Sequence, residues 1–285
     1  MDVPPVYRPI DLNSKAYSSH MHYTDPMIQK LRLIQRAHRY RNRHDPAELE
    51  AIRKALSPGC TVLDIGAHKG AYTYWMSKWA RPNGRLIAVE PQPDLAAKLR
   101  ELYTSASDIS IMHGAVGSSV GTITLHIPGE GPSHGASIRE LEGAEGITIR
   151  DIEVPCLTLE SIVSQHNLDR IDLIKCDTEG AEREIFQAGS DILRRFTPTV
   201  LVECEKRHAD DDADPVGELW DIFNQLGYTG QCFAGGRLIP IEDFDYAKHQ
   251  ADPDDKPNYG NNFFFTHPDH KRPGKPCGGG CTCAP

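Results

Sequence analysis

The stretch Thr61-Val62-Leu63-Asp64-Ile65-Gly66-Ala67-His68-Lys69-Gly70-Ala71-Tyr72 decides the fold of this chain. Its first half is an apolar strand pattern, and its second half opens a helix with apolar and aromatic spacing. Between the two, Gly66 allows a sharp turn and leaves no side chain between the backbone and a ligand. The helix start presents unpaired N–H groups and the positive end of the helix dipole. This order of elements is typical of a site for a nucleotide-like ligand.

The spacing of the glycines narrows the class of ligand. A dinucleotide site needs G-x-G-x-x-G, whereas this turn has Asp64-x-Gly66-x-x-x-Gly70 and is a poor cradle for a pyrophosphate. The next predicted strand, residues 85–90, ends in Glu90, and an acid there can accept both hydroxyls of a ribose. A nucleoside without phosphates fits these features, and S-adenosylmethionine is the common ligand of that kind. The alternative is a Rossmann-type sheet with an incidental turn.

Four segments, taken together, resemble one protein family. They are VLDIGAHKG at 62–70, VEP at 89–91, IKCDTEGAE at 174–182 and NNFFF at 261–265. In this order they resemble the FkbM family of S-adenosylmethionine-dependent methyltransferases. The resemblance implies methylation of hydroxyl groups on natural products or sugars, and therefore a small-molecule or glycan acceptor.

Strands and helices alternate from Thr61 onward, which predicts an α/β fold with a doubly wound, mostly parallel sheet. The family resemblance implies a seven-stranded, Rossmann-like methyltransferase sheet, with segments 228–233 and 262–266 as an antiparallel pair at one edge. We expect three parts along the chain. They are an N-terminal helical extension (1–45), the methyltransferase domain (46–266) and a disordered Cys/Gly-rich tail (267–285).

The N-terminal extension is predicted to contain a basic helix. Asp25-Pro26 is typical of a helix start, and apolar side chains follow at helical spacing. The other face of this helix carries basic side chains with no acid between them: Lys30, Arg32, Arg36, Arg39, Arg41 and Arg43. Such a face either docks an acidic carrier, a lipid or a substrate, or is a solvated face on a helix that packs over the catalytic domain. We favour the second interpretation.

Two further local predictions concern a helix start and a loop. Asp45-Pro46 is a second helix start, where Glu48 would complete a capping box. Residues 128–146 form a long glycine-rich loop, which is either a lid or disordered.

Four acids follow predicted strands and should meet at one edge of the sheet: Asp64, Glu90, Asp177 and Glu203. Asp64 would orient the glycine turn or meet an ammonium group of the ligand, and Glu90 would bind the ribose. His113 and Ala115 follow the third strand and would border the adenine. The expected cofactor-binding set is Asp64, Gly66, Ala67, His68, Gly70, Tyr72, Glu90, Gln92, His113, Ala115 and Asp177.

The catalytic prediction follows from the chemistry of a sulfonium methyl donor. The methyl group is already activated, so the enzyme must align the nucleophile and remove its proton. We expect Asp177 or Glu179 to act as the base, with Glu203 and His208 behind them. Because Asp177 and Glu203 end neighbouring strands, Mg²⁺ dependence is a less favoured variant.

Composition excludes several classes of protein. The formal net charge of −9 argues against nucleic-acid binding. The longest apolar run is shorter than the ~18 residues that a transmembrane helix needs. Residues 1–6 lack the basic and apolar regions of a signal peptide. We therefore expect a cytoplasmic protein; its oligomeric state is not indicated.

The eight cysteines form two groups. Five are scattered through apolar patterns and should be small buried hydrophobes in a reducing compartment. The other three, in the tail, could converge on Zn²⁺ or Cu(I), although we favour a passive tail that is dispensable for the fold. The first group is Cys60, Cys156, Cys176, Cys204 and Cys232, and the second is Cys277, Cys281 and Cys283.

Two other classes of function stay open. An NAD-dependent oxidoreductase is disfavoured because the turn lacks the middle glycine and no Ser/Tyr-x-x-x-Lys dyad follows. A non-catalytic cofactor-binding protein on a Rossmann-like sheet is the third class.

Overall fold

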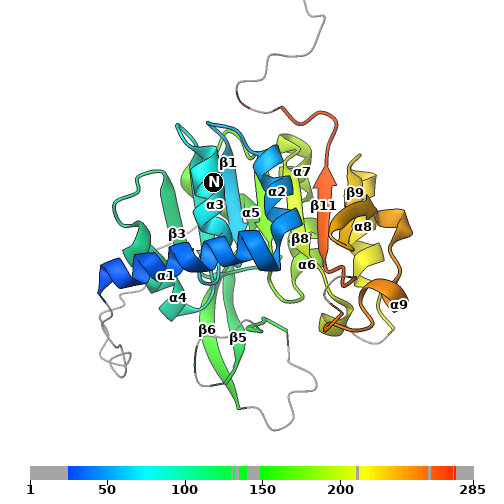
Figure 1. Cartoon of the computed structure of the whole chain (residues 1–285), viewed down its shortest axis with the longest axis horizontal. Helices are drawn as coiled ribbons and strands as arrows, with labels where there is room; N and C mark the ends of the chain where they lie inside the picture. The colour runs from blue at the N-terminus through cyan, green and yellow to red at the C-terminus, as the bar shows by residue number, and fades with distance from the viewer. Residues whose placement is uncertain are drawn as a thin grey trace, which may run out of the picture.

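The computed structural model describes residues 25–129, 131, 135–139, 148–209, 212–255, 258–271 and 273. A central sheet with helices on both faces dominates the molecule (Figure 1). The strands are β1 (Thr61–Ile65), β2 (Arg85–Glu90), β3 (Ile109–His113), β4 (Ala115–Val116), β5 (Gly121–Pro128), β6 (Ile149–Leu157), β7 (Leu173–Cys176), β8 (Thr199–Glu203), β9 (Thr229–Ala234), β10 (Arg237–Pro240) and β11 (Asn262–Thr266).

The helices alternate with these strands along the chain. The α-helices are α1 (Pro26–Arg39), α2 (Pro46–Ala55), α3 (Ala71–Ala80), α4 (Pro93–Tyr103), α5 (Leu159–His166), α6 (Glu182–Ala188), α7 (Ser190–Phe196), α8 (Pro215–Gln225) and α9 (Tyr246–His249). Shorter elements are the π-helix η2 (Tyr40–His44) and the 3₁₀-helices η3 (Lys206–His208) and η4 (Ile241–Asp243). None of the described helices is long and apolar enough to cross a membrane.

The central sheet has the strand order β10-β9-β11-β8-β7-β1-β2-β3. Strands β3, β2, β1, β7 and β8 are parallel, and β11 runs antiparallel to both β8 and β9. The predicted doubly wound, mostly parallel sheet is therefore confirmed. The number of strands differs from the expected seven, because the chain turns at Gly235-Gly236 after β9 and adds β10 as an eighth strand in the described part.

The parallel strands are buried on both faces, because successive side chains point to opposite sides of a sheet. In β1, Leu63 and Ile65 pack into the core under α5–α8, whereas Val62 packs into the core under α1–α4. The five cysteines that were expected to be buried are buried and free. The three tail cysteines, for which a passive tail was favoured over a metal site, lie outside the described residues: Cys277, Cys281 and Cys283.

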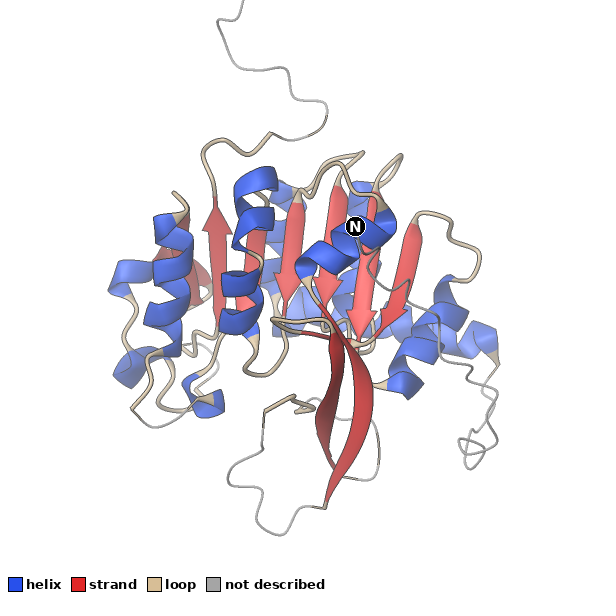
Figure 2. Ribbon diagram, turned by 180° about the vertical axis from the view of Figure 1, so that it is seen from behind, coloured by secondary structure: helices blue, strands red, loops and turns tan. Residues whose placement is uncertain are grey.

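A long β-hairpin projects from the end of the sheet at which the parallel strands finish (Figure 2). Strands β5 and β6 pair antiparallel, and with β4 they form a separate three-stranded sheet. Most of the loop predicted as a lid or as disordered (128–146) lies outside the described residues, namely residues 130, 132–134 and 140–146. The described piece 135–139 returns to β5, where His126 and Ser137 form an isolated bridge.

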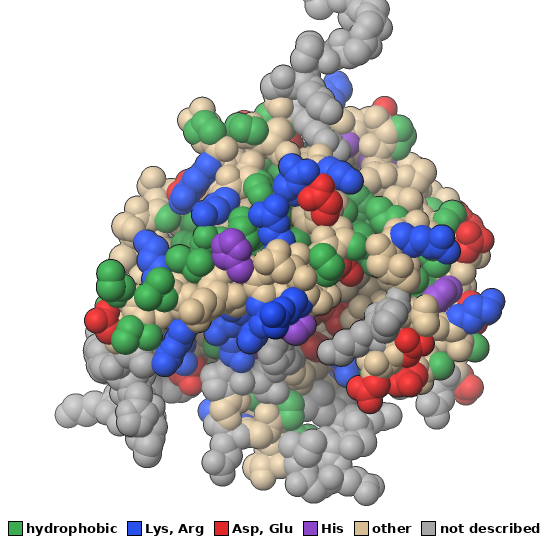
Figure 3. Space-filling model, viewed as in Figure 1, with side chains coloured by type: hydrophobic (Ala, Val, Ile, Leu, Met, Phe, Trp, Pro, Cys, Tyr) green, Lys and Arg blue, Asp and Glu red, His purple; other side chains and the backbone are tan. Residues whose placement is uncertain are grey.

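Helix α1 lies across one face of the molecule (Figure 1). Its buried residues are Leu33 and Ala37, and the indole Nε1 of Trp75 donates a hydrogen bond to the Ala37 carbonyl at 2.8 Å. Lys and Arg side chains gather along α1 on the opposite, exposed side (Figure 3). The predicted helix therefore does pack against the rest of the molecule, but its basic side is not solvated throughout, because Arg36 is partly buried.

The two predicted caps have different outcomes. Asp25 caps α1 by accepting a hydrogen bond from the Met27 N–H at 2.8 Å. Asp45 precedes α2 but makes no side-chain cap, so the predicted capping box with Glu48 is wrong. The carboxylate of Asp45 instead accepts a hydrogen bond from the Tyr72 hydroxyl at 2.9 Å, which turns it away from the helix.

Candidate active site

A cavity of about 950 Å³ lies at the carboxyl ends of the parallel strands. Its wall includes the glycine turn after β1, the end of β2, and the segments that follow β7 and β8. The remaining wall comes from η2 and the start of α2, from β4, and from the segment before β11. Ligands in open α/β sheets bind at this edge, so the location agrees with the prediction from the four acids.

The glycine turn passes directly beneath the chain that leaves β7. Gly66 has φ +73°, and a Cβ built there would lie 1.8 Å from the carbonyl oxygen of Asp177. A glycine is therefore needed at position 66 because the backbone of Asp177 lies so close. The sequence alone had suggested a different reason, the close approach of a ligand. At the helix end of the turn, Gly70 has φ +77°, and a Cβ there would meet Leu99 at 2.7 Å.

Glu90 is the acid that the main chain holds most firmly. Its Oε2 accepts a hydrogen bond from the His68 N–H at 2.6 Å, and its Oε1 accepts one from the Gln92 N–H at 2.9 Å. Burial raises the pKa of Glu90 to about 7, against the opposing effect of these two N–H donors. The carboxyl group lines the cavity and keeps free lone pairs, so it fits two ribose hydroxyls.

Lys175, in β7, is a buried lysine that the sequence analysis did not assign. Its Nζ donates hydrogen bonds to the Gly66 carbonyl at 2.9 Å and to Asp177 Oδ2 at 3.1 Å. It also lies 3.9 Å from Asp64 Oδ1. Burial lowers the pKa of Lys175, but Asp177 and Asp64 outweigh that effect and the net pKa is raised. The Lys175 ammonium group therefore connects β1, the glycine turn and the loop that follows β7.

Asp64 lies behind the cavity wall and does not line it. Its side chain is fully buried, and its Oδ2 accepts a hydrogen bond from the Thr73 hydroxyl at 2.5 Å. Burial raises the pKa of Asp64, an effect that Lys175 and Thr73 oppose. Of the two roles expected for it, this placement favours orienting the glycine turn.

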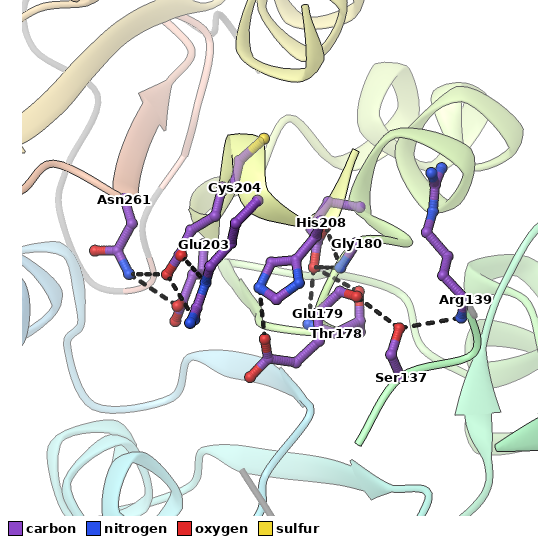
Figure 4. Close-up of polar contacts among 12 residues, drawn as sticks. Ser137, Arg139, Thr178, Glu179, Gly180, Glu203, Cys204, His208 and Asn261 are labelled. Atoms are coloured by element: carbon purple, nitrogen blue, oxygen red, sulfur yellow. Dashed lines mark hydrogen bonds and ion pairs between the residues drawn. The ribbon is translucent and has the colours of Figure 1, made fainter. Parts of the chain in front are cut away.

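The loop after β7 carries two of the predicted catalytic acids, and side chains from other elements hold it in place (Figure 4). Glu179, at φ +56°, pairs with His208 at 2.8 Å, and its carbonyl accepts a hydrogen bond from the Ser137 hydroxyl at 2.7 Å. Burial lowers the pKa of His208, but the Glu179 carboxylate outweighs it and the net pKa is raised. Glu182 caps the loop by accepting hydrogen bonds from Thr178 N–H and Oγ1 and from Gly180 N–H, so its role is structural.

Glu203 belongs to a second polar group beyond β8 (Figure 4). The Asn261 amide donates to Glu203 Oε1 at 2.8 Å and to Glu205 Oε1 at 2.7 Å. Glu205 also accepts a hydrogen bond from the Tyr259 hydroxyl at 2.9 Å and pairs with Arg207. Burial and the neighbouring acids raise the pKa of Glu203 well above its usual value, whereas Glu203, Asn261 and Arg207 lower that of Glu205 despite burial.

The N-terminal segment closes one side of the cavity. Arg36, Tyr40, Arg43 and His44 all line the wall, beside the pair formed by Asp45 and Tyr72. Burial raises the pKa of Asp45, and burial with Asp45 raises that of Tyr72. A π-helix such as η2 is rare in proteins and is found most often at functional sites.

Most of the predicted site residues meet at this cavity. Gly66, Ala67, His68, Tyr72, Glu90, Gln92, Ala115, Asp177, Glu179 and Glu203 line the wall. Asp64, Gly70 and His113 do not, and His113 Nε2 lies 3.0 Å from the Pro91 carbonyl instead. Other wall residues were not predicted as site residues: Tyr40, Lys175, Glu205, Tyr259 and Asn261. Arg36 and Arg43 were predicted only as members of a basic helix face. Lys175 could have been predicted from the sequence, because it stands inside the apolar strand pattern Ile174-Lys175-Cys176 and a buried lysine needs a partner.

The Mg²⁺ variant finds little support in the described part of the chain. No group of three or more His, Cys, Asp or Glu side chains there is placed to hold a metal ion. Asp177 and Glu203 do end neighbouring strands, but the Lys175 ammonium already lies against the Asp177 carboxylate.

Comparison with known proteins gives one family and several relatives. The model of the "Methyltransferase FkbM domain" matches residues 64–229, which is more than half of the chain. The chain is 28% identical over 208 residues to the 2-O-methyltransferase NoeI of Sinorhizobium fredii (strain NBRC 101917 / NGR234), covering 66% of this chain and 83% of that protein.

Solved structures with a similar arrangement are more distant in sequence. The methyltransferase FkbM of Methylobacillus flagellatus KT is 13% identical with a TM-score of 0.45, covering 84% of this chain. The present chain spans 58% of the length of that protein. The fibrillarin of Aeropyrum pernix, solved with bound S-adenosyl-L-methionine, is 14% identical with a TM-score of 0.39, covering 82% of this chain and 73% of that one.

Proposed function

This chain belongs to the FkbM methyltransferase family, and from that premise we propose that it transfers a methyl group from S-adenosylmethionine to a hydroxyl oxygen of a small-molecule or glycan acceptor. The observation that carries the proposal is the composition of the cavity at the carboxyl ends of the parallel strands. One part of its wall, around Gly66 and Glu90, fits an adenosine, and another part presents the carboxylates of Asp177, Glu179 and Glu203. A hydroxyl group needs such an acceptor for its proton.

The donor would be held mainly by the turn after β1 and the end of β2. Glu90, oriented by two backbone N–H groups, would accept the ribose hydroxyls. Gln92 and Ala115 line the same part of the wall and would border the adenine. When bound, this cofactor supplies a methyl group on a sulfonium, which needs no further activation.

Asp177 is the proposed base. Its carboxylate lines the cavity, and Lys175 holds it at 3.1 Å while its main chain lies against Gly66. Glu179 is the second candidate, because its pairing with His208 fixes its side chain. Glu203 is better suited to donate a hydrogen bond than to act as the base, because its raised pKa favours the protonated carboxyl group.

Oxygen as the nucleophile is also supported by the relative NoeI, which is a 2-O-methyltransferase. A net charge of −9 favours a small acceptor over a nucleic acid. We further propose that residues 46–266 form the methyltransferase domain and that the extension 1–45 completes its cavity through Arg36, Tyr40, Arg43 and His44.

The test is a screen for labelled-methyl transfer to fractionated extracts, with Asp177→Asn as the diagnostic variant. This substitution keeps the shape and removes the charge, so turnover should fall by ~10²-fold or more while binding of S-adenosylhomocysteine survives. Asp191→Asn, on the exposed side of α7, is the matched control and should not change turnover.

Three results would count against the proposal. Full turnover in Asp177→Asn would show that Asp177 is not the base. If turnover is lost only in Glu179→Gln, Glu179 is the base instead. Calorimetry that finds NAD binding and no S-adenosylmethionine binding would favour the oxidoreductase alternative. Cofactor binding without transfer to any acceptor would favour a non-catalytic protein.

A further inference from the structure

The cavity wall has an uneven distribution of charge. Most of it is acidic, through Glu90, Asp177, Glu179, Glu203 and Glu205. The corner formed by α1, η2 and the glycine turn is different, because three cationic side chains line the wall there: Arg36, Arg43 and Lys69. We call these three residues the cationic corner.

The cationic corner is anchored to the glycine turn itself. Arg36 Nη1 donates a hydrogen bond to the Lys69 carbonyl at 3.1 Å, so the helix α1 and the turn are joined at this point. Both side chains are partly buried. The pKa of Lys69 is lowered, mainly by burial and to a smaller extent by the positive charges of Arg36 and Lys98. Burial is also the main cause that lowers the pKa of Arg36.

These cations lack an acidic partner in the described part of the chain. The acids of the cavity are engaged elsewhere: Asp177 with Lys175, Glu179 with His208, and Glu205 with Arg207. No carboxylate of a described residue forms an ion pair with Arg36, Arg43 or Lys69. Arg36 and Lys69 are partly buried and Arg43 is exposed at the rim. Partly buried cations that face a cavity without a counter-ion favour an anionic ligand group.

We infer that Arg36, Lys69 and Arg43 form a subsite for the carboxylate of the methyl donor's methionine moiety, an inference that rests on the proposed function. S-adenosylmethionine carries two positive groups and one negative group. The acidic wall suits its sulfonium and ammonium groups and repels its carboxylate. Lys175 and Arg207 also line the wall but are paired with Asp177 and Glu205, whereas the cations of the cationic corner have no such partner among the described residues. The cationic corner adjoins the turn that the donor must cover between Glu90 and Asp177.

The experiment compares two ligands that differ only in this carboxylate: S-adenosylhomocysteine and its decarboxylated analogue. Dissociation constants are measured by calorimetry for the full-length protein and for Lys69→Met, Arg36→Met and Arg36→Lys. Lys69→Met should weaken S-adenosylhomocysteine by ~10-fold or more and leave the decarboxylated analogue within about twofold, since a charge-assisted hydrogen bond is lost only with the first ligand.

The remaining variants separate charge from structure. Arg36→Met also removes the bond to the Lys69 carbonyl, whereas Lys69→Met keeps it, because only the Lys69 side chain changes. Arg36→Lys should restore most of the affinity for S-adenosylhomocysteine. Arg39→Met, on the same helix but outside the cavity wall, is the matched control and should bind both ligands as the parent does.

Several outcomes would overturn the inference. Equal losses for both ligands would show that the corner acts only through the shape of the turn. Unchanged affinity for both, with a raised KM for the acceptor, would assign the corner to an anionic acceptor instead. In both cases the parent enzyme would still transfer methyl groups, so the proposed function would be unaffected. A parent enzyme that binds neither ligand would overturn the proposed function together with the subsite.

Discussion

The two ends of the cavity are built in different ways. At the glycine turn, Glu90 is held by backbone N–H groups, and Gly66 lies against the backbone of Asp177. Beyond β8, Glu203 and Glu205 are held by the side chains of Asn261 and Tyr259. Backbone contacts constrain the local sequence tightly, whereas side-chain networks can be replaced one member at a time. The first end therefore suits a ligand common to a family, and the second suits an acceptor that differs among its members.

The largest expected effect tests the backbone-held end. Gly66→Ala should lower the free energy of unfolding by roughly 4–6 kcal/mol, because the new Cβ would clash with the Asp177 carbonyl and the left-handed conformation would be strained. Urea unfolding measures the loss. Gly236→Ala is the control: it has φ +69° and no atom within 4 Å of the new Cβ, so it should lose only about 1–2 kcal/mol. Equal losses in the two variants would show that strain alone acts at Gly66.

A smaller effect concerns the protonation of Glu90. Its pKa is raised to about 7, so the group is protonated below that pH and ionised above it. Ribose hydroxyls donate to the ionised form, so the affinity for S-adenosylhomocysteine should rise between pH 6 and pH 8 and then level off. Glu90→Gln should remove this slope and weaken binding at pH 8 by ~10-fold, or about 1.4 kcal/mol.

The control for this pH dependence is another carboxyl group in the same wall. Burial also raises the pKa of Glu48 to about 7. Glu48→Gln should keep the slope of affinity with pH, because Glu48 lies at the start of α2 and away from the backbone donors that orient Glu90. A slope that disappears in Glu48→Gln and persists in Glu90→Gln would place the ribose elsewhere.

The smallest effect belongs to the end held by side chains. Tyr259→Phe removes one hydrogen bond to Glu205 and should lower the free energy of unfolding by about 0.5–1.5 kcal/mol. The affinity for S-adenosylhomocysteine should stay within about twofold, since Glu205 has other partners in Asn261 and Arg207. A large loss of cofactor affinity would mean that the two ends of the cavity are not independent.

The same difference explains what the sequence could predict. Short motifs at strand ends contain Gly66, Glu90 and Asp177. A parallel sheet brings the carboxyl ends of its strands to one edge, so the sheet topology alone places these residues together. Asn261 and Tyr259 reach Glu205 only because β11 pairs with β8, a contact between segments distant in sequence. No local pattern indicates that contact.

The errors have local causes. The capping box at Asp45 failed because a tertiary partner, Tyr72, competes for the same carboxylate. Strand β10 was missed although Gly235-Gly236 between two short apolar runs is a hairpin signal. Arg36 and Arg43 were predicted only as members of a basic helix face, because nothing in the sequence of α1 and η2 shows which arginines face the cavity.

The close approach of Gly66 to Asp177 has a consequence for engineering. The glycine turn after β1 and the loop after β7 share one interlocking backbone contact, and Lys175 bonds to both. Exchanging either segment with that of another family member would mismatch the two surfaces. A chimera that changes the acceptor should therefore carry over residues 64–70 and 173–182 as one unit, and should draw its diversity from the strands beyond β8.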